Sequence, residues 1–102
     1  VSKVENMSSM FCGSKFNSDI SKWNVSNVRD MCGMFHGSKF NSDISKWNVS
    51  RVKDMRGMFA DSIFNGNIYK WDVSNANDVA FMLDDCPLKN RPEHQPKFLK
   101  EL

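Results

Sequence analysis

The residues best suited to chemistry in this sequence are two thiols and an imidazole, Cys12, Cys32 and His36. Cys32 and His36 are four residues apart, which places two side chains on one face of a helix. Cys12 precedes His36 by 24 residues, the period of an internal repeat. Stacked copies would therefore bring these two within about 5 Å of each other. Thiolate and imidazole are preferred ligands of zinc, and three of them can hold the ion, so these residues form a candidate metal site.

Two observations favour a plainer interpretation of these thiols. In the next copy of the repeat the same columns contain Arg56 and Ala60, so the repeat does not preserve the candidate ligands. With Cys86 the chain has three cysteines, and an odd number at irregular spacing is no disulfide framework. We therefore interpret them as free thiols. Because no acid–base pair recurs from copy to copy, we expect no enzymatic activity and no cofactor.

Length and composition limit the classes of protein to which the chain can belong. Its 102 residues are enough for one domain, and 40% of them are hydrophobic, so it can bury a core. The formal net charge of +2 is too small to predict binding to nucleic acid. No apolar run of about 20 residues predicts a membrane span, and no secretion signal is recognisable. The chain opens in mid-repeat, with residues 1–4 matching 25–28, and we interpret it as a fragment or a processed chain.

The repeat organises most of the chain. The segment SKFNSDISKWNVS occurs unchanged at residues 14–26 and 38–50, and a drifted copy begins at Phe64. Aligned by this period, apolar residues change only to other apolar residues, as expected for stacked coils with continuous inward columns. The predicted coils lie near residues 1–15, 16–39, 40–63 and 64–86. The main columns are Met7, Met31, Met55 and Val79; Met10, Met34, Met58 and Met82; Phe11, Phe35, Phe59 and Leu83; Phe16, Phe40, Phe64 and Leu88; and Trp23, Trp47 and Trp71.

Two further predictions concern hydrogen bonds between the copies. The tryptophan column is interpreted as core, with each indole N–H bonded to a turn carbonyl. The alternative is an exposed ladder on which sugar rings stack. Asn17, Asn41 and Asn65 are predicted to form a buried ladder in which each side chain bonds the backbone at a turn. The alternative for these residues is three exposed turn asparagines.

Two periodicities alternate within one copy. Apolar residues recur at helical spacing from Val28 to Phe35, after Ser26, a residue type favoured as an N-cap, so a short helix ending near Gly37 is predicted. Alternation over Trp23–Val25 predicts a strand of about three residues, which would form a parallel sheet with its copies. Parallel strands need a crossover that is usually helical and right-handed. The sequence therefore predicts an α/β repeat at residues 1–86, a short right-handed solenoid of strand–helix coils.

The last part of the chain differs from the copies. Residues 87–102, PLKNRPEHQPKFLKEL, contain all three prolines. The end of a stack of repeats needs a polar face toward solvent, so we predict that this segment is a C-terminal cap, with a final helical turn at 97–102. The first copy has no such cap. An uncapped N-terminal coil predicts a surface open to self-association.

The segment FNSDISKWNVSNVRDMCGMF at residues 16–35 resembles a bacterial surface-protein repeat of about 25 residues, the DUF285 family. That family occurs in surface lipoproteins of mycoplasmas and lactic acid bacteria, and is similar to the BspA-like branch of leucine-rich repeats. The resemblance covers about residues 1–86. It implies a leucine-rich-repeat-like solenoid, location at the cell surface or secretion, and adhesion or binding to a partner.

Outward-facing columns remain as candidates for a binding site. They would form a flat strip on the strand face, suited to an extended partner, although a solvated face is the plainer interpretation. The first functional hypothesis is a non-enzymatic module that binds a protein or a host-surface ligand. The second is a structural spacer or self-assembling fragment of a longer repeat array. The strip comprises Ser21, Lys22, Asn24, Ser45, Lys46, Asn48, Tyr69, Lys70 and Asp72.

Overall fold

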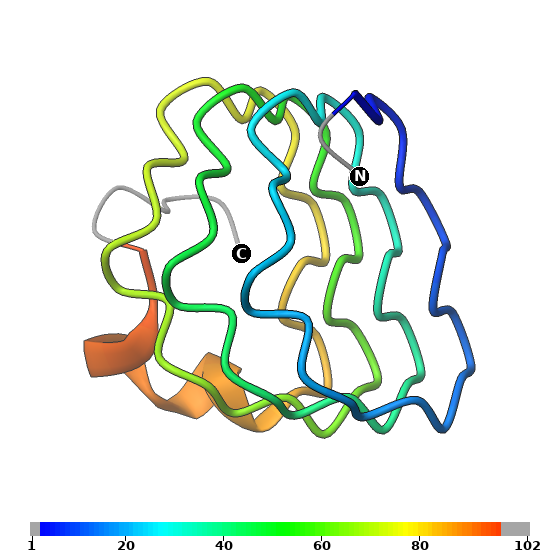
Figure 1. Cartoon of the computed structure of the whole chain (residues 1–102). Helices are drawn as coiled ribbons and strands as arrows, with labels where there is room; N and C mark the ends of the chain where they lie inside the picture. The colour runs from blue at the N-terminus through cyan, green and yellow to red at the C-terminus, as the bar shows by residue number, and fades with distance from the viewer. Residues whose placement is uncertain (1–2, 97–102) are drawn as a thin grey trace.

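Backbone hydrogen bonds join each copy of the repeat to the next in one constant register, so that the copies lie side by side (Figure 1). The structure is a computed structural model in which residues 3–96 are described. The N–H of Met7 donates to the carbonyl of Asp30, and the N–H of Met31 donates to that of Asp54, both at 2.9 Å. No strand forms among the described residues. Isolated parallel bridges pair Asn6 with Asp30, Asp30 with Asp54, and Asp54 with Asp78.

The backbone bonds between copies are concentrated in the turn segments, residues 5–14, 29–38, 53–62 and 77–86. Alternate residues of a turn segment use their N–H groups differently. The N–H of Met34 closes a β-turn on the carbonyl of Met31 at 3.2 Å, whereas the N–H of Phe35 donates to Met58 in the next copy at 2.9 Å. A turn segment is therefore a series of β-turns in which every second N–H joins the neighbouring copy.

The helix predicted between Ser26 and Gly37 is wrong, and backbone geometry gives the reason. Gly33 and Gly37 have φ values of 61° and 65°, in the left-handed region that a right-handed helix excludes. Both occupy the third position of a β-turn, where a type II turn requires a positive φ. A helix would also direct its N–H groups along its own axis and leave none for the next copy. Successive β-turns bury the regularly spaced apolar residues instead.

The strand predicted at Trp23–Val25 is wrong as well. There the N–H of Trp23 closes a turn on the carbonyl of Ile20 at 3.1 Å and does not pair with a neighbouring copy. The regular elements of residues 3–96 are two 3-10 helices, η1 (Pro87–Asn90) and η2 (Pro92–His94). The prediction of a right-handed, leucine-rich-repeat-like α/β solenoid is therefore overturned. The chain is instead a compact body of 33 × 29 × 20 Å made of irregular turns.

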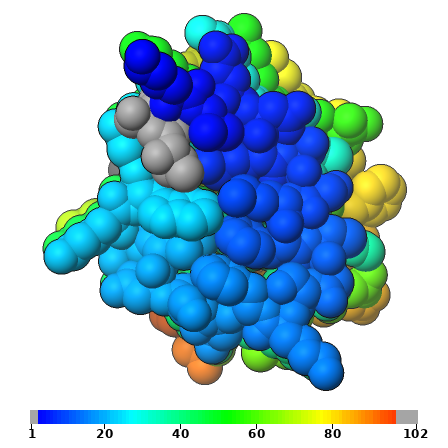
Figure 2. All heavy atoms as spheres, turned by 45° about the vertical axis from the view of Figure 1, so that its right-hand side comes forward, coloured from blue at the N-terminus to red at the C-terminus, as the bar shows by residue number. Residues whose placement is uncertain are grey.

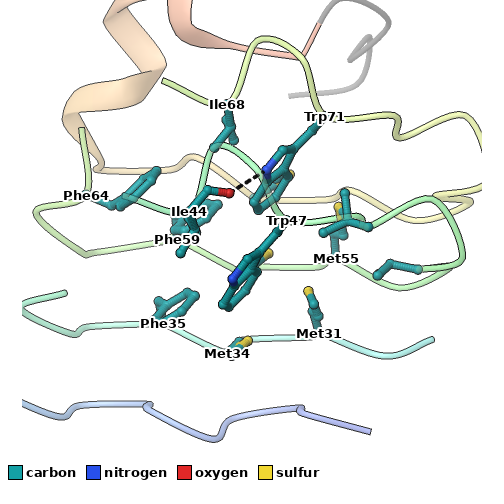
Figure 3. Close-up of a cluster of buried hydrophobic side chains, with 14 of the residues drawn as sticks. Met31, Met34, Phe35, Ile44, Trp47, Met55, Phe59, Phe64, Ile68 and Trp71 are labelled. Atoms are coloured by element: carbon teal, nitrogen blue, oxygen red, sulfur yellow. Dashed lines mark hydrogen bonds between the residues drawn. The ribbon is translucent and has the colours of Figure 1, made fainter. Parts of the chain in front are cut away.

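Side chains replace backbone groups as the links between copies in the tryptophan segments, residues 16–28, 40–52 and 64–76. The indole Nε1 of Trp47 donates to the carbonyl of Ile20 at 3.0 Å. The indole Nε1 of Trp71 donates in the same way to the carbonyl of Ile44 at 3.0 Å, the bond dashed in Figure 3. Both rings are buried. The prediction of a core tryptophan bonded to a turn carbonyl is thus confirmed for these two residues.

The apolar columns form the core, with aromatic rings stacked from copy to copy. Ring centroids of Phe11 and Phe35 are 5.6 Å apart, as are those of Phe35 and Phe59. Burial of each such ring stabilises the fold by roughly 1.5–3 kcal/mol. The first copy is less protected than the others, since Met10 is 48% exposed while Met34 of the same column is fully buried.

The two 3-10 helices lie beside the last copy (orange in Figure 1). Leu88 of η1 is buried and continues the column of Phe16, Phe40 and Phe64. The N–H of Ile68 donates to the carbonyl of His94 of η2 at 2.9 Å. The helical turn predicted at 97–102 lies outside the described residues. None of the helices in the described part of the chain is long and apolar enough to cross a lipid bilayer.

The two outer edges of the stacked turn segments are complementary. Among residues 3–96, a row of carbonyl groups at the first edge accepts no backbone hydrogen bond, and a row of N–H groups at the last edge finds no acceptor. Figure 2 shows the N-terminal end of the molecule, covered by the first copy (dark blue to cyan). The carbonyl row consists of Asn6, Ser8, Met10 and Cys12, and the N–H row of Val79, Phe81, Leu83 and Asp85.

Candidate functional site

A groove of about 640 Å³ lies over the second and third tryptophan segments. It brings together part of the predicted binding strip, namely Ser45, Lys46, Tyr69 and Lys70. The first copy's Ser21 and Lys22 do not line it. Sequence reasoning missed the other lining residues, although their three columns are polar in the first two copies and two of these columns change type in the third. These are Asn41, Ser42, Asp43, Asn65, Gly66 and Asn67.

The groove becomes more positive toward the third copy. In the second copy, hydrogen bonds donated by Ser45 hold the pKa of Asp43 below its usual range, and the charge of Lys46 lowers it slightly further. In the third copy Asn67 replaces this aspartate, so Lys70 has no equivalent carboxylate beside it. Lys70 is exposed and forms no ion pair within residues 3–96.

Tyr69 adds the only phenol of the chain to this groove. Its side chain is 45% exposed, while the corresponding residues of the first two copies are serines. Its N–H donates to Oδ1 of Asn67 at 2.9 Å, as the N–H of Ser45 does to Asp43 at 2.8 Å, so the turn is unchanged by the substitution. An exposed aromatic face beside two ammonium groups can stack and hydrogen-bond with a ligand.

The asparagine column of the predicted strip takes part in turns through its side-chain oxygens. The N–H and Oγ of Ser26 donate to Oδ1 of Asn24 at 3.0 and 2.6 Å. Ser50 bonds Asn48 in the same way, at 3.1 and 2.7 Å. In the third copy Ser74 makes these bonds to Asp72 and holds the pKa of its carboxyl below the usual range. Asn24, Asn48 and Asp72 are therefore turn residues whose side-chain acceptors are already engaged.

Asn17, Asn41 and Asn65 form a ladder of hydrogen bonds between the copies, and Asn41 and Asn65 also line the groove. The N–H of Asn41 donates to Oδ1 of Asn17 at 2.7 Å, and the N–H of Asn65 donates to Oδ1 of Asn41 at 2.9 Å. The predicted ladder is confirmed, but its burial is not, because Asn17 and Asn41 are exposed. Oδ1 of Asn65 is the last acceptor, and it is buried without a hydrogen-bond partner within residues 3–96. The ladder thus ends at the groove.

The candidate zinc ligands do not converge. Cys12 and His36 meet as predicted, with Sγ 3.8 Å from Nδ1. Cys32 is separate from them: its N–H donates to Oδ1 of Asp30 at 2.9 Å, and it lies near Asp54. No group of three or more His, Cys, Asp or Glu side chains in the described part of the chain is placed to hold a metal ion. The three-ligand site allowed by the sequence is therefore not formed.

The groove offers amides, hydroxyls, the carboxylate of Asp43, two ammonium groups and one phenol. This chemistry is suited to recognition through hydrogen bonds and charge.

Comparison with protein families matches the chain to "Mycoplasma protein of unknown function, DUF285" over residues 1–95. Comparisons with curated proteins and with solved structures give no match. The family match includes all the copies of the repeat and continues through both 3-10 helices. It therefore extends past residue 86, where the repeat was predicted to end. The chain belongs to the DUF285 family.

Proposed function

We propose that the chain is a non-enzymatic binding module of a bacterial cell-surface protein, and that its groove contacts a protein or host-surface ligand. The observation that carries this proposal is the convergence of Lys46, Tyr69 and Lys70 around one hollow of about 640 Å³. Lys46 and Lys70 can attract carboxylate or sulfate groups, and Tyr69 can anchor the contact because tyrosine is enriched at binding hot spots.

The third copy supports this proposal by its departures from the repeat. The core positions Ile68 and Trp71 repeat Ile44 and Trp47 and are buried like them. Three of the lining positions change instead, to Gly66, Asn67 and Tyr69. Substitutions in the groove beside an unchanged Ile68 and Trp71 are what we expect where the outward face is adapted to a ligand.

A cell-binding measurement tests the proposal. Fluorescently labelled chain is added to cultured epithelial cells, and bound label is measured by flow cytometry at increasing salt concentration. The variant Lys46→Glu/Lys70→Glu is expected to lose most binding, and Tyr69→Ala part of it. The matched control is Lys39→Glu/Lys53→Glu, which makes the same charge change at exposed lysines outside the groove. Equal binding by both double variants, or no binding by the unmodified chain, would contradict the proposal.

A second candidate function is self-assembly, which the two complementary edges favour. The open carbonyl row of one molecule has the spacing of the carbonyls that accept the internal bonds, so it fits the open N–H row of another. The half-buried side chains of Phe11 and Phe16 would become less exposed to solvent in such a head-to-tail contact. Two identical edges would not fit, because each offers groups of one kind only.

Sedimentation velocity at increasing concentration tests self-assembly. The unmodified chain is expected to gain mass, and Met10→Glu at the first edge is expected to remain monomeric. Lys39→Glu, away from both edges, should behave like the unmodified chain. A chain that stays monomeric at the highest concentration rules this candidate out.

A further inference from the structure

Three side chains from consecutive turn segments form a line on the surface that the binding proposal does not use. Sγ of Cys12 lies 3.8 Å from Nδ1 of His36, and Nε2 of His36 lies 3.3 Å from Oδ2 of Asp61. The N–H of Gly13 donates to the carbonyl of His36 at 2.7 Å, which fixes the first two copies at this point. The register of the copies, and not a mobile loop, therefore holds the thiol, the ring and the carboxylate in order.

The order of the three groups determines their chemistry. A carboxylate at Nε2 favours the tautomer with its proton there, which leaves the Nδ1 lone pair directed at the thiol. Nδ1 can then accept the proton of Cys12, and Asp61 stabilises the imidazolium that forms. Among residues 3–96, Asp61 is the one acidic side chain that forms an ion pair with the His36 ring. The product of this transfer is a thiolate, the nucleophilic form of cysteine.

The other two thiols lie in surroundings that oppose ionisation. Burial raises the pKa of the Cys32 thiol, and the neighbouring carboxylate of Asp54 raises it further. Burial also raises the pKa of Cys86, whose Sγ donates to the carbonyl of Phe64 at 3.1 Å. Cys12, by contrast, is exposed to solvent and contacts a base. Of the three thiols, Cys12 is therefore the one that is exposed and contacts a base.

We propose that Cys12 is a site of thiol–disulfide exchange with low-molecular-weight disulfides, activated by His36, whose ring Asp61 orients. The thiol proton moves to Nδ1 of His36, and the thiolate attacks one sulfur of the disulfide. A new S–S bond forms at Cys12 while the S–S bond of the reagent breaks, and the leaving thiolate takes up the proton from the imidazolium. The disulfide is the oxidant, so the step balances without another reactant.

Mass spectrometry with oxidised glutathione tests the proposal. The reduced full chain is incubated with an excess of the disulfide, quenched with acid at intervals, and mapped by peptide. Cys12 is expected to form its adduct about ten times faster than Cys32 or Cys86, and faster than the same cysteine in the chain unfolded by denaturant. Cys12 reacting no faster than Cys32 and Cys86, or no faster than in the unfolded chain, would overturn the proposal.

Three variants separate activation by the ring from a structural role. His36→Gln is expected to slow the reaction about tenfold near neutral pH and to approach the unmodified rate above about pH 9, where the thiol ionises unaided. Asp61→Asn should slow it less, and asparagine tolerates the positive φ of 56° at this position. Asp85→Asn, the matched position one copy further on, should leave the rate unchanged. A His36→Gln profile identical to that of the unmodified chain at every pH refutes the assignment.

Discussion

Neighbouring copies are joined by different kinds of hydrogen bond in the turn segments and in the tryptophan segments of this chain. Turn segments join neighbouring copies through backbone groups, as between Met31 and Asp54, so residue types can vary there if the backbone conformation is kept. Tryptophan segments join them through specific side chains, such as Trp47 on the carbonyl of Ile20. Loss of one side chain there removes the link itself. We therefore expect the two regions to respond to different kinds of substitution.

The largest effect is expected from Trp47→Phe, in a tryptophan segment. The change should lower the free energy of unfolding by about 2–3 kcal/mol, because it loses ring volume and removes the indole hydrogen bond to the carbonyl of Ile20, which then accepts only from the N–H of Trp23. Trp23→Phe is the matched control, since the indole of Trp23 has no hydrogen-bond partner within residues 3–96 and its ring is half-buried. Urea denaturation measures both. Equal losses would mean that the indole bond contributes nothing measurable.

The next effect concerns backbone conformation in the turn segments. Gly33→Ala should destabilise the fold by about 1–2 kcal/mol, because its φ of 61° is unfavourable for any residue with a Cβ. No clash contributes, since the added Cβ would lie 3.6 Å from Oγ of Ser9.

The corresponding position two copies later should respond with the opposite sign. Phe81 has a φ of 61° and is 67% exposed, so Phe81→Gly should stabilise the fold by about 0.5–1 kcal/mol. Thermal and urea unfolding of both variants provide the measurement. Changes of the same sign in the two variants would contradict the turn geometry.

A smaller effect is expected in the asparagine ladder. Asn41→Ala should cost about 1 kcal/mol, because the N–H of Asn65 loses its acceptor. Asn65→Ala removes an acceptor that has no partner within residues 3–96, and should be close to neutral. The pair of variants isolates the ladder bond, since both remove the same side chain. A cost for Asn65→Ala equal to that for Asn41→Ala would show that the bond to the next copy is unimportant.

The smallest effect is a dependence of stability on pH that arises mainly in the tryptophan segments. Hydrogen bonds from serines two residues on lower the pKa of Asp19, Asp43 and Asp72 from the ordinary 3.8. Such groups bind protons more weakly in the folded chain, so their stabilisation is present above about pH 4 and is lost as the pH falls through the folded pKa. Asp43→Asn, which copies the natural Asn67, should reduce this acid sensitivity. An unchanged acid-unfolding profile in that variant would contradict the assignment.

The sequence was sufficient to predict the core and insufficient to predict the backbone path. Burial of Met31, Phe35 and Trp47 follows from the columns, because the interior of every copy must match that of its neighbour. Helix and strand were wrong because apolar spacing alone cannot distinguish a helix from consecutive β-turns. The glycines at 33 and 57, one repeat apart, were the available signal, and both have positive φ.

The candidate site was predicted in part for a related reason. Lys46, Tyr69 and Lys70 were found because outward columns can be recognised from the repeat, and they do line the groove. Asn24 does not line the groove, and its Oδ1 accepts from Ser26 in its own turn, so its membership of the binding strip stays a prediction. The contact of Cys12 with His36 was predicted, since these residues are one repeat apart. The contact of Asp61 with His36 was not predicted, because it depends on the turn geometry.

The complementary edges have a consequence for how such a gene can change in length. Each copy presents acceptors on one side and donors on the other at the same spacing, so removing or inserting one whole period rejoins surfaces that already fit. The unchanged segments at residues 14–26 and 38–50 also favour misaligned recombination, which adds or removes whole periods. Whole repeats can therefore be added to or removed from this protein without changing the packing of its core.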